Sequence, residues 1–252
     1  MMKAPTERFS DRVDDYVRFR PGYPPILIET LIRKCCLNQH SIVADIGSGT
    51  GILSRQLLDR HLSVIAVEPN SEMRLAAESM LSAYDGYTSI RGSAEDTHLA
   101  DKSIDVITAA QSFHWFKQDA SYVEFARILK EGGRVALIWN RRNLHQAFQR
   151  DYDALLSEKA PEYDLVNHMN IADKEIADFF SPKAYETHTF ENRQSLDRTS
   201  FLGRLKSASY LPPADSTEYA VLMERADQLF SEYAAGGRVF FEYDACLYIG
   251  QL

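Results

Sequence analysis

The sequence has few cysteines and lacks the segments that mark secreted or membrane proteins. Its three cysteines, Cys35, Cys36 and Cys246, form no C-x-x-C pair, so neither a disulfide framework nor a zinc site is indicated. We expect Cys35 and Cys36 to be small buried residues of an amphipathic helix. No apolar run is long enough to span a membrane, and the first eight residues lack the apolar core of a signal peptide. These absences predict a soluble, cytoplasmic protein.

Positive charge is also scarce. The chain has 28 Lys and Arg against 36 Asp and Glu, which gives a formal net charge of -8. This acidic excess counts against nucleic acid or an anionic membrane as the partner. Arg141-Arg142 is the one conspicuous basic pair near the candidate site described below; its plain explanation is a solvated loop, and the alternative is that Arg141 holds an acceptor carboxylate. The oligomeric state stays open.

The chain of 252 residues, 45% of them hydrophobic, is long enough to bury a large core. Apolar segments alternate with helical patterns, which predicts an α/β fold with a parallel sheet covered on both faces. The expected strands are 41–47, 63–69, 87–91, 104–110 and 133–139. The expected helices begin at Pro25, at Gly51, at Ser71 and near Asp119. In such a sheet, ligands bind beyond the carboxyl ends of the strands.

This alternation stops after Asn143. Residues 145–180 have a helical, polar-rich pattern, and we expect a substrate-side insertion packed over the sheet edge. Strands are expected at 185–196 and 239–249, and helices at 199–209 and 216–234. We therefore predict one domain, 1–252, with four parts. These are an N-terminal lid (1–24), a cofactor-binding core (25–143), the insertion (144–183) and a C-terminal part (184–252).

The most informative segment is Val43–Ser54, which reads as a strand, a glycine loop and the start of a helix. Glycines in the loop let the backbone turn tightly and approach a ligand, and the helix directs its free amide groups toward that ligand. A second apolar strand ends in Glu68, about 20 residues further on, where nucleotide-binding βαβ units have a ribose-binding acid. The glycine loop and Glu68 together predict a site for an adenosine-containing cofactor.

The glycine spacing separates two cofactor classes. Dinucleotide sites have G-x-G-x-x-G, whereas here the third glycine comes one residue early and Ile52 takes its place. With Asp45 in front, the D-x-G-x-G-x-G run resembles the first motif of class I S-adenosylmethionine-dependent methyltransferases. This resemblance implies a Rossmann-like sheet of seven strands in the order 3-2-1-4-5-7-6. It also implies helices on both faces, an antiparallel C-terminal strand, and S-adenosylmethionine as the cofactor.

The resemblance also implies roles for individual residues. Asp45 anchors the loop or reaches the methionine ammonium, with a helix-capping carboxylate as the alternative. Glu68 accepts bonds from the ribose hydroxyls, and the segment around Ala94 and Glu95 resembles the adenine-binding loop. Met73 covers the adenine or ribose, or is a plain core residue. The candidate cofactor-binding residues are Tyr16, Arg20, Asp45, Gly47, Gly49, Gly51, Glu68, Pro69, Met73, Ala94, Glu95 and Gln111.

The segment 109–116 follows the fourth expected strand and is rich in aromatic and hydrogen-bonding groups. Gln111 is placed to contact the methionine part of the cofactor. His114 is the candidate catalytic residue, because a histidine with a pKa near neutrality can orient or deprotonate an acceptor. A hydrogen-bonded histidine packed under Trp115 is the alternative. Before the sheet, Tyr16 and Arg20 lie in the expected lid, where Arg20 can hold the methionine carboxylate through a bidentate pair.

We predict methyl transfer from S-adenosylmethionine to a small-molecule acceptor, by in-line displacement at the sulfonium methyl. The lid and the segment 110–116 resemble the branch that contains type 11 and trans-aconitate-type methyltransferases. Two alternatives stay open. One is methylation of RNA or protein, and the other is a non-catalytic protein that binds S-adenosylmethionine. The sequence identifies neither the acceptor nor its accepting atom.

Overall fold

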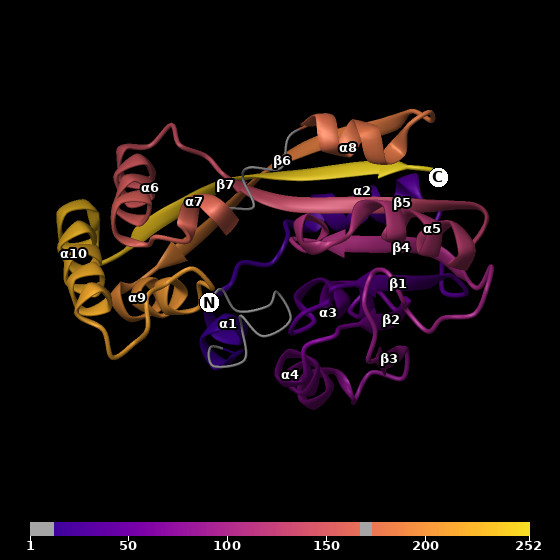
Figure 1. The fold of residues 1–252 in the computed structure, drawn as a ribbon, viewed down its shortest axis with the longest axis horizontal. Coiled ribbons are helices and arrows are strands. Elements are labelled where there is room, and N and C mark those ends of the chain that lie inside the picture. The colour runs from indigo at the N-terminus through magenta and orange to yellow at the C-terminus, as the bar shows by residue number, and fades with distance from the viewer. Residues whose placement is uncertain (1–12, 167–172) are drawn as a thin grey trace.

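The computed structural model describes residues 13–166 and 173–252 and contains a seven-stranded sheet in the order β3-β2-β1-β4-β5-β7-β6 (Figure 1). Strands β1 to β5 pair in parallel, and β7 runs antiparallel to both β5 and β6. The predicted fold class and strand order are therefore confirmed. The strands are β1 (Ile42–Ile46), β2 (Ser63–Val67), β3 (Tyr87–Ile90), β4 (Ile104–Ala110), β5 (Leu129–Arg142), β6 (Tyr185–Leu196) and β7 (Val239–Gly250).

Helices cover both faces of this sheet, as the continuous apolar strands require. On one face, α2 (Pro25–Lys34) and α3 (Ile52–Leu58) pack on alternate residues of β1, β4 and β5. On the other face, α5 (Gln118–Ile128) and α8 (Asp173–Phe180) pack on the remaining residues of the same strands. The strand residues of each face are fully buried, so each face fixes the register of the sheet.

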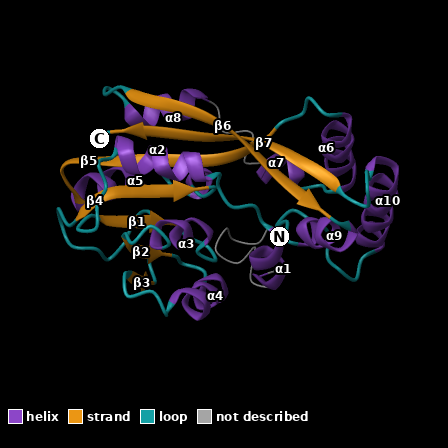
Figure 2. Cartoon of the chain, turned by 180° about the vertical axis from the view of Figure 1, so that it is seen from behind, coloured by secondary structure: helices purple, strands orange, loops and turns teal. Residues whose placement is uncertain are grey.

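A second hydrophobic core surrounds the far ends of β6 and β7, which run beyond the parallel strands (Figure 2). Four helices form it: α6 (Ala147–Lys159), α7 (Tyr163–Val166), α9 (Arg198–Lys206) and α10 (Thr217–Tyr233). The packing therefore divides the expected insertion 144–183 between the two cores. Its first two helices join α9 and α10, whereas α8 joins the core of the sheet.

The segment from α1 (Val13–Phe19) to Tyr23 connects the two cores. The side chains of Asn192 and Asn140 donate to the carbonyl of Gly22, at 2.9 and 3.2 Å. The ring of Phe19 packs directly against Gly203 in α9. A methyl group at that glycine would lie 2.2 Å from the ring, so a side chain there would collide with it. The predicted lid, 1–24, begins in residues 1–12, which lie outside the described residues. Figure 1 shows α1 between α9 and α4.

Two of the element boundaries that differ from the sequence prediction change where particular residues lie. The helix expected from 119 to 130 ends at Ile128, and β5 begins at once and continues to Arg142, well past the expected end at residue 139. Helix α2, which was expected to contain Cys35 and Cys36 as buried residues, ends at Lys34. Cys36 has a left-handed backbone (φ 52°) and an exposed side chain, because the chain turns there to enter β1. The prediction that it is buried is wrong.

Helices built from the described residues are all too short or too polar to cross a bilayer. Membrane spanning needs about 20 consecutive apolar residues, and the 17-residue α10 carries charged residues along its length.

The contact between Phe19 and Gly203 gives a test of how α1 is held. We expect Gly203→Ala to lower the free energy of unfolding by about 1–3 kcal/mol, because the added methyl group meets an aromatic ring in a packed core. Tryptic cleavage after Arg18 should become faster. The control is Thr199→Ala, an exposed position in the first turn of the same helix. Unchanged melting and cleavage in Gly203→Ala would contradict the packing of α1 on α9.

Candidate functional site

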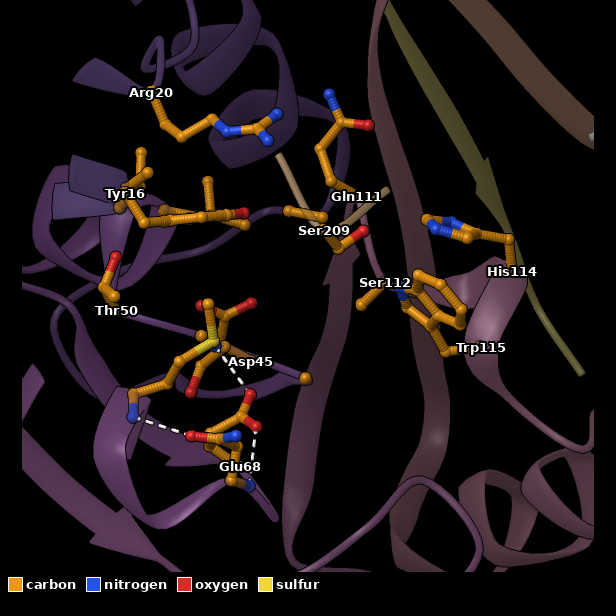
Figure 3. Close-up of a pocket in the computed structure, with 18 of the residues that line it drawn as sticks. Tyr16, Arg20, Asp45, Thr50, Glu68, Gln111, Ser112, His114, Trp115 and Ser209 are labelled. Carbon is orange, nitrogen blue, oxygen red and sulfur yellow. Dashed lines mark hydrogen bonds between the residues drawn. The ribbon is translucent and has the colours of Figure 1, made fainter. Parts of the chain in front are cut away.

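A large pocket opens at the carboxyl ends of β1, β2 and β4 and has a volume of about 1670 Å3, its open mouth included. The described residues that sequence reasoning selected converge on it (Figure 3). Those that line it are Tyr16, Arg20, Asp45, Gly47, Gly49, Glu68, Pro69, Met73, Ala94, Glu95, Gln111 and His114.

The glycine loop between β1 and α3 forms the floor of the pocket. The amide groups of Gly47 and Ser48 donate to the carbonyl of Val67 at 2.9 and 3.2 Å, which joins the loop to the end of β2. Gly47 has φ +66°, and a methyl group there would lie 2.6 Å from Cβ of Ser112. Only glycine fits this position, since both the backbone angle and the close neighbour exclude a side chain.

Gly51 differs from its predicted role, because it lies outside the wall of the pocket. It precedes α3 with φ +80°, and a methyl group there would lie 2.6 Å from Cδ1 of Leu81. Its absent side chain therefore lets α4 (Ser71–Leu81) approach α3. Gly51 is needed for packing of the loop, and it does not face the ligand space.

Asp45 lies under the loop and is almost completely buried. Its two carboxylate oxygens accept hydrogen bonds from Ser54 Oγ at 2.6 Å and from Thr108 Oγ1 at 2.9 Å. Burial raises the pKa of this carboxyl group to about 6, although both hydrogen bonds lower it. Asp45 therefore ties β1 to α3 and β4, and it also lines the pocket, so its role toward the cofactor stays a prediction.

Glu68, directly after β2, points into the same space. Its Oε2 accepts from the amide of Gly49 and its Oε1 from the amide of Asn70, both at 2.8 Å. Burial raises the pKa of this carboxyl group, and the two backbone bonds oppose that change. Each oxygen keeps a lone pair that can accept another donor from the pocket. Asn70 in turn caps α4 by accepting from the amide of Met73, which places the Met73 sulfur over the loop.

The loop after β3 adds a third wall. Ala94 is buried and packs in the core, so its backbone forms this part of the surface. Glu95 accepts from the amide of Lys117 at 2.8 Å, which joins the loop to the start of α5.

The segment after β4 holds the most strained residue of the pocket. Gln111 has a left-handed backbone (φ 57°), which is rare for a side chain other than glycine or asparagine. Its Nε2 donates to the carbonyl of Asn140 at 3.4 Å, while its buried Oε1 has no partner among the residues that the structure describes. An unpaired buried acceptor in a cavity wall is suited to a donor from a ligand.

His114 lies in a short turn, Phe113–Trp115, and its ring centroid is 4.7 Å from that of Trp115. Burial lowers the pKa of this imidazole to about 4. This pKa lies well below the unperturbed value near neutrality, because the ring is removed from water. At neutral pH, His114 is an uncharged hydrogen-bonding group.

Sequence reasoning missed the other end of the pocket. Its wall comes from the second core and comprises Arg142, Tyr163, Arg204, Ser209, Tyr210 and Tyr243. Arg142 was expected in a solvated loop, but it is buried at the end of β5 and pairs with Asp153 at 2.8 Å. Its neighbour Arg141 lies outside the wall and pairs with Asp173 at 3.2 Å. The wrong expectation followed from placing the end of β5 too early.

Arg20 reaches this end from the segment after α1. Its Nε donates to Ser207 Oγ at 2.9 Å and its Nη2 donates to the Ser207 carbonyl at 3.2 Å. The guanidinium lies 5.0 Å from the ring centroid of Tyr16. These contacts fix the Arg20 side chain at the edge of the pocket. Because Ser207 and Tyr16 are uncharged, they leave the positive charge of the guanidinium able to pair with an anionic ligand group.

Comparisons with known proteins agree with this geometry. Residues 44–137, which contain the glycine loop, Glu68 and the segment after β4, match the model of a methyltransferase domain of type 11. This part of the chain is thus similar to methyltransferase domains, in agreement with the predicted resemblance, and S-adenosylmethionine is the cofactor that such a domain implies.

Individual proteins give the same picture. An uncharacterized methyltransferase of Mycobacterium tuberculosis is 34% identical over 148 residues, which are 59% of this chain and 58% of that protein. The chain therefore spans less than two thirds of this relative. A candidate type II methyltransferase of Anaeromyxobacter dehalogenans has a similar fold, with a TM-score of 0.68 at 22% identity over 92% of this chain and 98% of that one.

A further structural relative is a phosphoethanolamine N-methyltransferase of Haemonchus contortus, bound to phosphomonomethylethanolamine and S-adenosylhomocysteine. Its TM-score is 0.57 at 15% identity, over 96% of this chain and 58% of that one. At this identity the likeness concerns the fold of the methyltransferase domain alone.

The buried position of Asp45 in this domain gives a pH test. Its pKa in the folded state, about 6, exceeds its ordinary value of 3.8. The protonated form is therefore favoured by folding, and its contribution to stability is lost as the pH rises from about 4 to 6. Between pH 5 and 7.5 the wild type should lose about 1 kcal/mol of unfolding free energy relative to Asp45→Asn. Chemical denaturation at both pH values measures this, with exposed Asp85→Asn as control. Parallel pH curves for wild type and Asp45→Asn would exclude the raised pKa.

Proposed function

We propose that this protein transfers the methyl group of S-adenosylmethionine to a small organic acceptor. The observation that carries the proposal is that one pocket joins two different halves. One half has the glycine loop and Glu68, and the other is walled by arginine and tyrosine side chains from the second core. The cofactor is proposed to occupy the first half and the acceptor the second.

The cofactor is assigned to the half beside the sheet. Glu68 accepts from the ribose hydroxyls with the lone pairs that its backbone bonds leave free. The adenine lies between Met73 and the loop of Ala94 and Glu95, beside Pro69. The methionine part follows the loop at Gly47 and Gly49 toward Gln111, whose unpaired Oε1 accepts a donor there. Arg20 holds the carboxylate of the methionine part, with Tyr16 beside it.

The aromatic walls of the acceptor half favour a small molecule over RNA or protein. It is lined by Tyr163 of α7, Tyr210 of the loop after α9 and Tyr243 of β7, and Tyr16 of α1 lines the same pocket. A polymer would need an open groove with excess positive charge, and the chain carries a net charge of -8. The structural relative from Haemonchus contortus also holds a small molecule with its cofactor product.

Methyl transfer requires alignment more than acid-base chemistry, since the sulfonium already activates the methyl carbon. The pocket supplies the alignment and excludes water. His114 contributes a hydrogen bond to the acceptor, and it carries no charge at neutral pH because burial lowers its pKa to about 4. This arrangement suits acceptor atoms that keep a free lone pair without a strong base.

Cofactor binding is the first test. Calorimetry should detect binding of S-adenosylhomocysteine and S-adenosylmethionine, and none of NAD. Glu68→Gln should weaken binding of S-adenosylhomocysteine about 10-fold, because the charge that accepts from the ribose is removed while the shape is kept. The matched control is Glu72→Gln, an exposed acid four residues further on. Tight binding of NAD with no response to either sulfur nucleoside would reject the proposed function.

The pH dependence of methyl transfer tests His114. Because its pKa lies near 4, the imidazole stays neutral and kcat/KM should show no step from His114 between pH 6 and 8. His114→Ala should reduce kcat roughly 10- to 100-fold by losing an aligning hydrogen bond, with the Kd of S-adenosylhomocysteine unchanged. His114→Gln should recover part of the rate. A wild-type inflection near pH 6.5 that disappears in His114→Gln would show that it acts as a general base.

A further inference from the structure

Charge is divided along the length of the pocket. The acidic side chains in its wall are Asp45, near the end of β1, and Glu68 and Glu95, in the loops after β2 and β3. The basic ones are Arg20, Arg142 and Arg204. A buried guanidinium needs an opposite charge or a complete set of hydrogen bonds, since leaving water is costly for an ion.

Two of these three arginines have an assigned partner. Arg142 is neutralised by Asp153 and also bonds the hydroxyl of Tyr163. Under the proposed function, Arg20 holds the carboxylate of the cofactor. Arg204 is the remaining positive charge in this wall.

Arg204 is 6% exposed and has no carboxylate partner within the described chain. Its Nε donates to Gln194 Oε1 at 3.2 Å and to the hydroxyl of Tyr243 at 3.1 Å, and its guanidinium lies 4.4 Å from the ring centroid of Phe241. No hydrogen bond from its two terminal nitrogens is present among residues 13–166 and 173–252. These nitrogens form the edge of the guanidinium that suits a bidentate carboxylate.

Arg204 is charged at neutral pH, because a guanidinium is not deprotonated in proteins. Its pKa lies above its usual range although burial lowers it, and Tyr243, whose hydroxyl accepts from Nε, is among the groups that oppose the effect of burial. Tyr210 and Ser209 also line the pocket, and their hydroxyl groups can donate to a bound anion. The site therefore combines a permanent positive charge with neutral donors and aromatic walls.

We propose that Arg204 binds the carboxylate of an organic-acid acceptor, and that this carboxylate is an anchor while another atom of the same molecule accepts the methyl group. This proposal rests on the proposed function and names the substrate class. One unpaired guanidinium matches a carboxylate monoanion better than a phosphate dianion. A carboxylate paired with a guanidinium is a weak nucleophile, because its lone pairs are engaged by the N–H donors.

The placement of Arg204 agrees with an anchoring role. Helix α9, which carries it, lies on the far side of α1 from the loop between β1 and α3 in both overall views (Figures 1 and 2). The acceptor thus extends from Arg204 toward Gln111 and His114. There, a lone pair of its oxygen, nitrogen or sulfur atom forms the bond to the methyl carbon. The bond from that carbon to sulfur breaks with its electrons going to sulfur, and any proton on the acceptor atom leaves to water.

The test uses hydroxy-, amino- and mercapto-carboxylic acids, each paired with its primary amide and with the corresponding phosphate monoester. Transfer of a labelled methyl group from S-adenosylmethionine measures kcat and KM. The wild type should prefer at least one acid over its amide by roughly 30-fold or more, with the label on the second group of the acid. Arg204→Gln should raise the KM for that acid roughly 10- to 100-fold and leave the KM for the amide unchanged. Arg204→Lys should be intermediate.

Controls separate this proposal from the proposed function. Arg198→Gln removes a charge from an exposed position of the same helix, where Arg198 pairs with Asp227, and should change neither KM. The Kd of S-adenosylhomocysteine should stay within 2-fold in Arg204→Gln. If that variant does not fold, Tyr243→Phe removes the hydroxyl that Arg204 contacts and should raise the KM for the acid several-fold.

The proposal that Arg204 anchors a carboxylate would be overturned if acid and amide were used equally well, or if the phosphate monoester were preferred. It would also be overturned if the label appeared on the only carboxylate of the acid, or if no acid bound saturably to the protein in the presence of S-adenosylhomocysteine. A loss of S-adenosylhomocysteine binding in Arg204→Gln would reassign this arginine to the cofactor. Failure of the wild type to bind S-adenosylhomocysteine would instead reject the proposed function itself.

Discussion

The buried carboxylate of Asp45 is the interaction on which the rest of the site depends. Its two oxygens hold Ser54 of α3 and Thr108 of β4, so one side chain fixes a strand, the helix after it and the neighbouring strand. The glycine loop lies directly above this junction. Because three of the five loop residues are glycines, the shape of the loop is set largely from beneath by Asp45 and from the side by Glu68, which accepts from the amide of Gly49. A ligand that binds the loop therefore meets a surface already in position.

The pocket exists because two hydrophobic cores share one hairpin. Strands β6 and β7 complete the sheet at one end and carry the second core at the other. Tyr243 belongs to that second core and lines the pocket, so the hairpin brings an acceptor wall to a cofactor site built by a different part of the chain. The segment around Gly22 is held by Asn140 of β5 and Asn192 of β6. The segment around Gly22 and the acceptor wall of the pocket are thus attached to the same region of the sheet.

The charge inside the pocket runs against the charge of the whole chain. A net charge of -8 sets the long-range field, whereas a bound molecule responds to the few groups that surround it in a medium of low dielectric constant. Arg204 and Arg142 are buried where water screens them poorly, and of the two only Arg142 has an acidic partner among the residues that the structure describes. The same burial lowers the pKa of His114 and raises that of Asp45, so each ionisable group is shifted toward its neutral form unless a partner opposes it.

The sequence by itself determined the sheet, the glycine loop and the acid at Glu68, because these features are local. Apolar runs, glycines and a fixed spacing within one βαβ unit are readable without knowledge of distant contacts. It did not determine that Gly51 serves packing against Leu81, that Arg142 is buried, or that His114 has a low pKa. Nor did it select Arg204, which lies more than 130 residues after the loop and has no motif around it. Burial, pKa and the pairing of charges depend on which segments meet in space, and only the tertiary structure decides that.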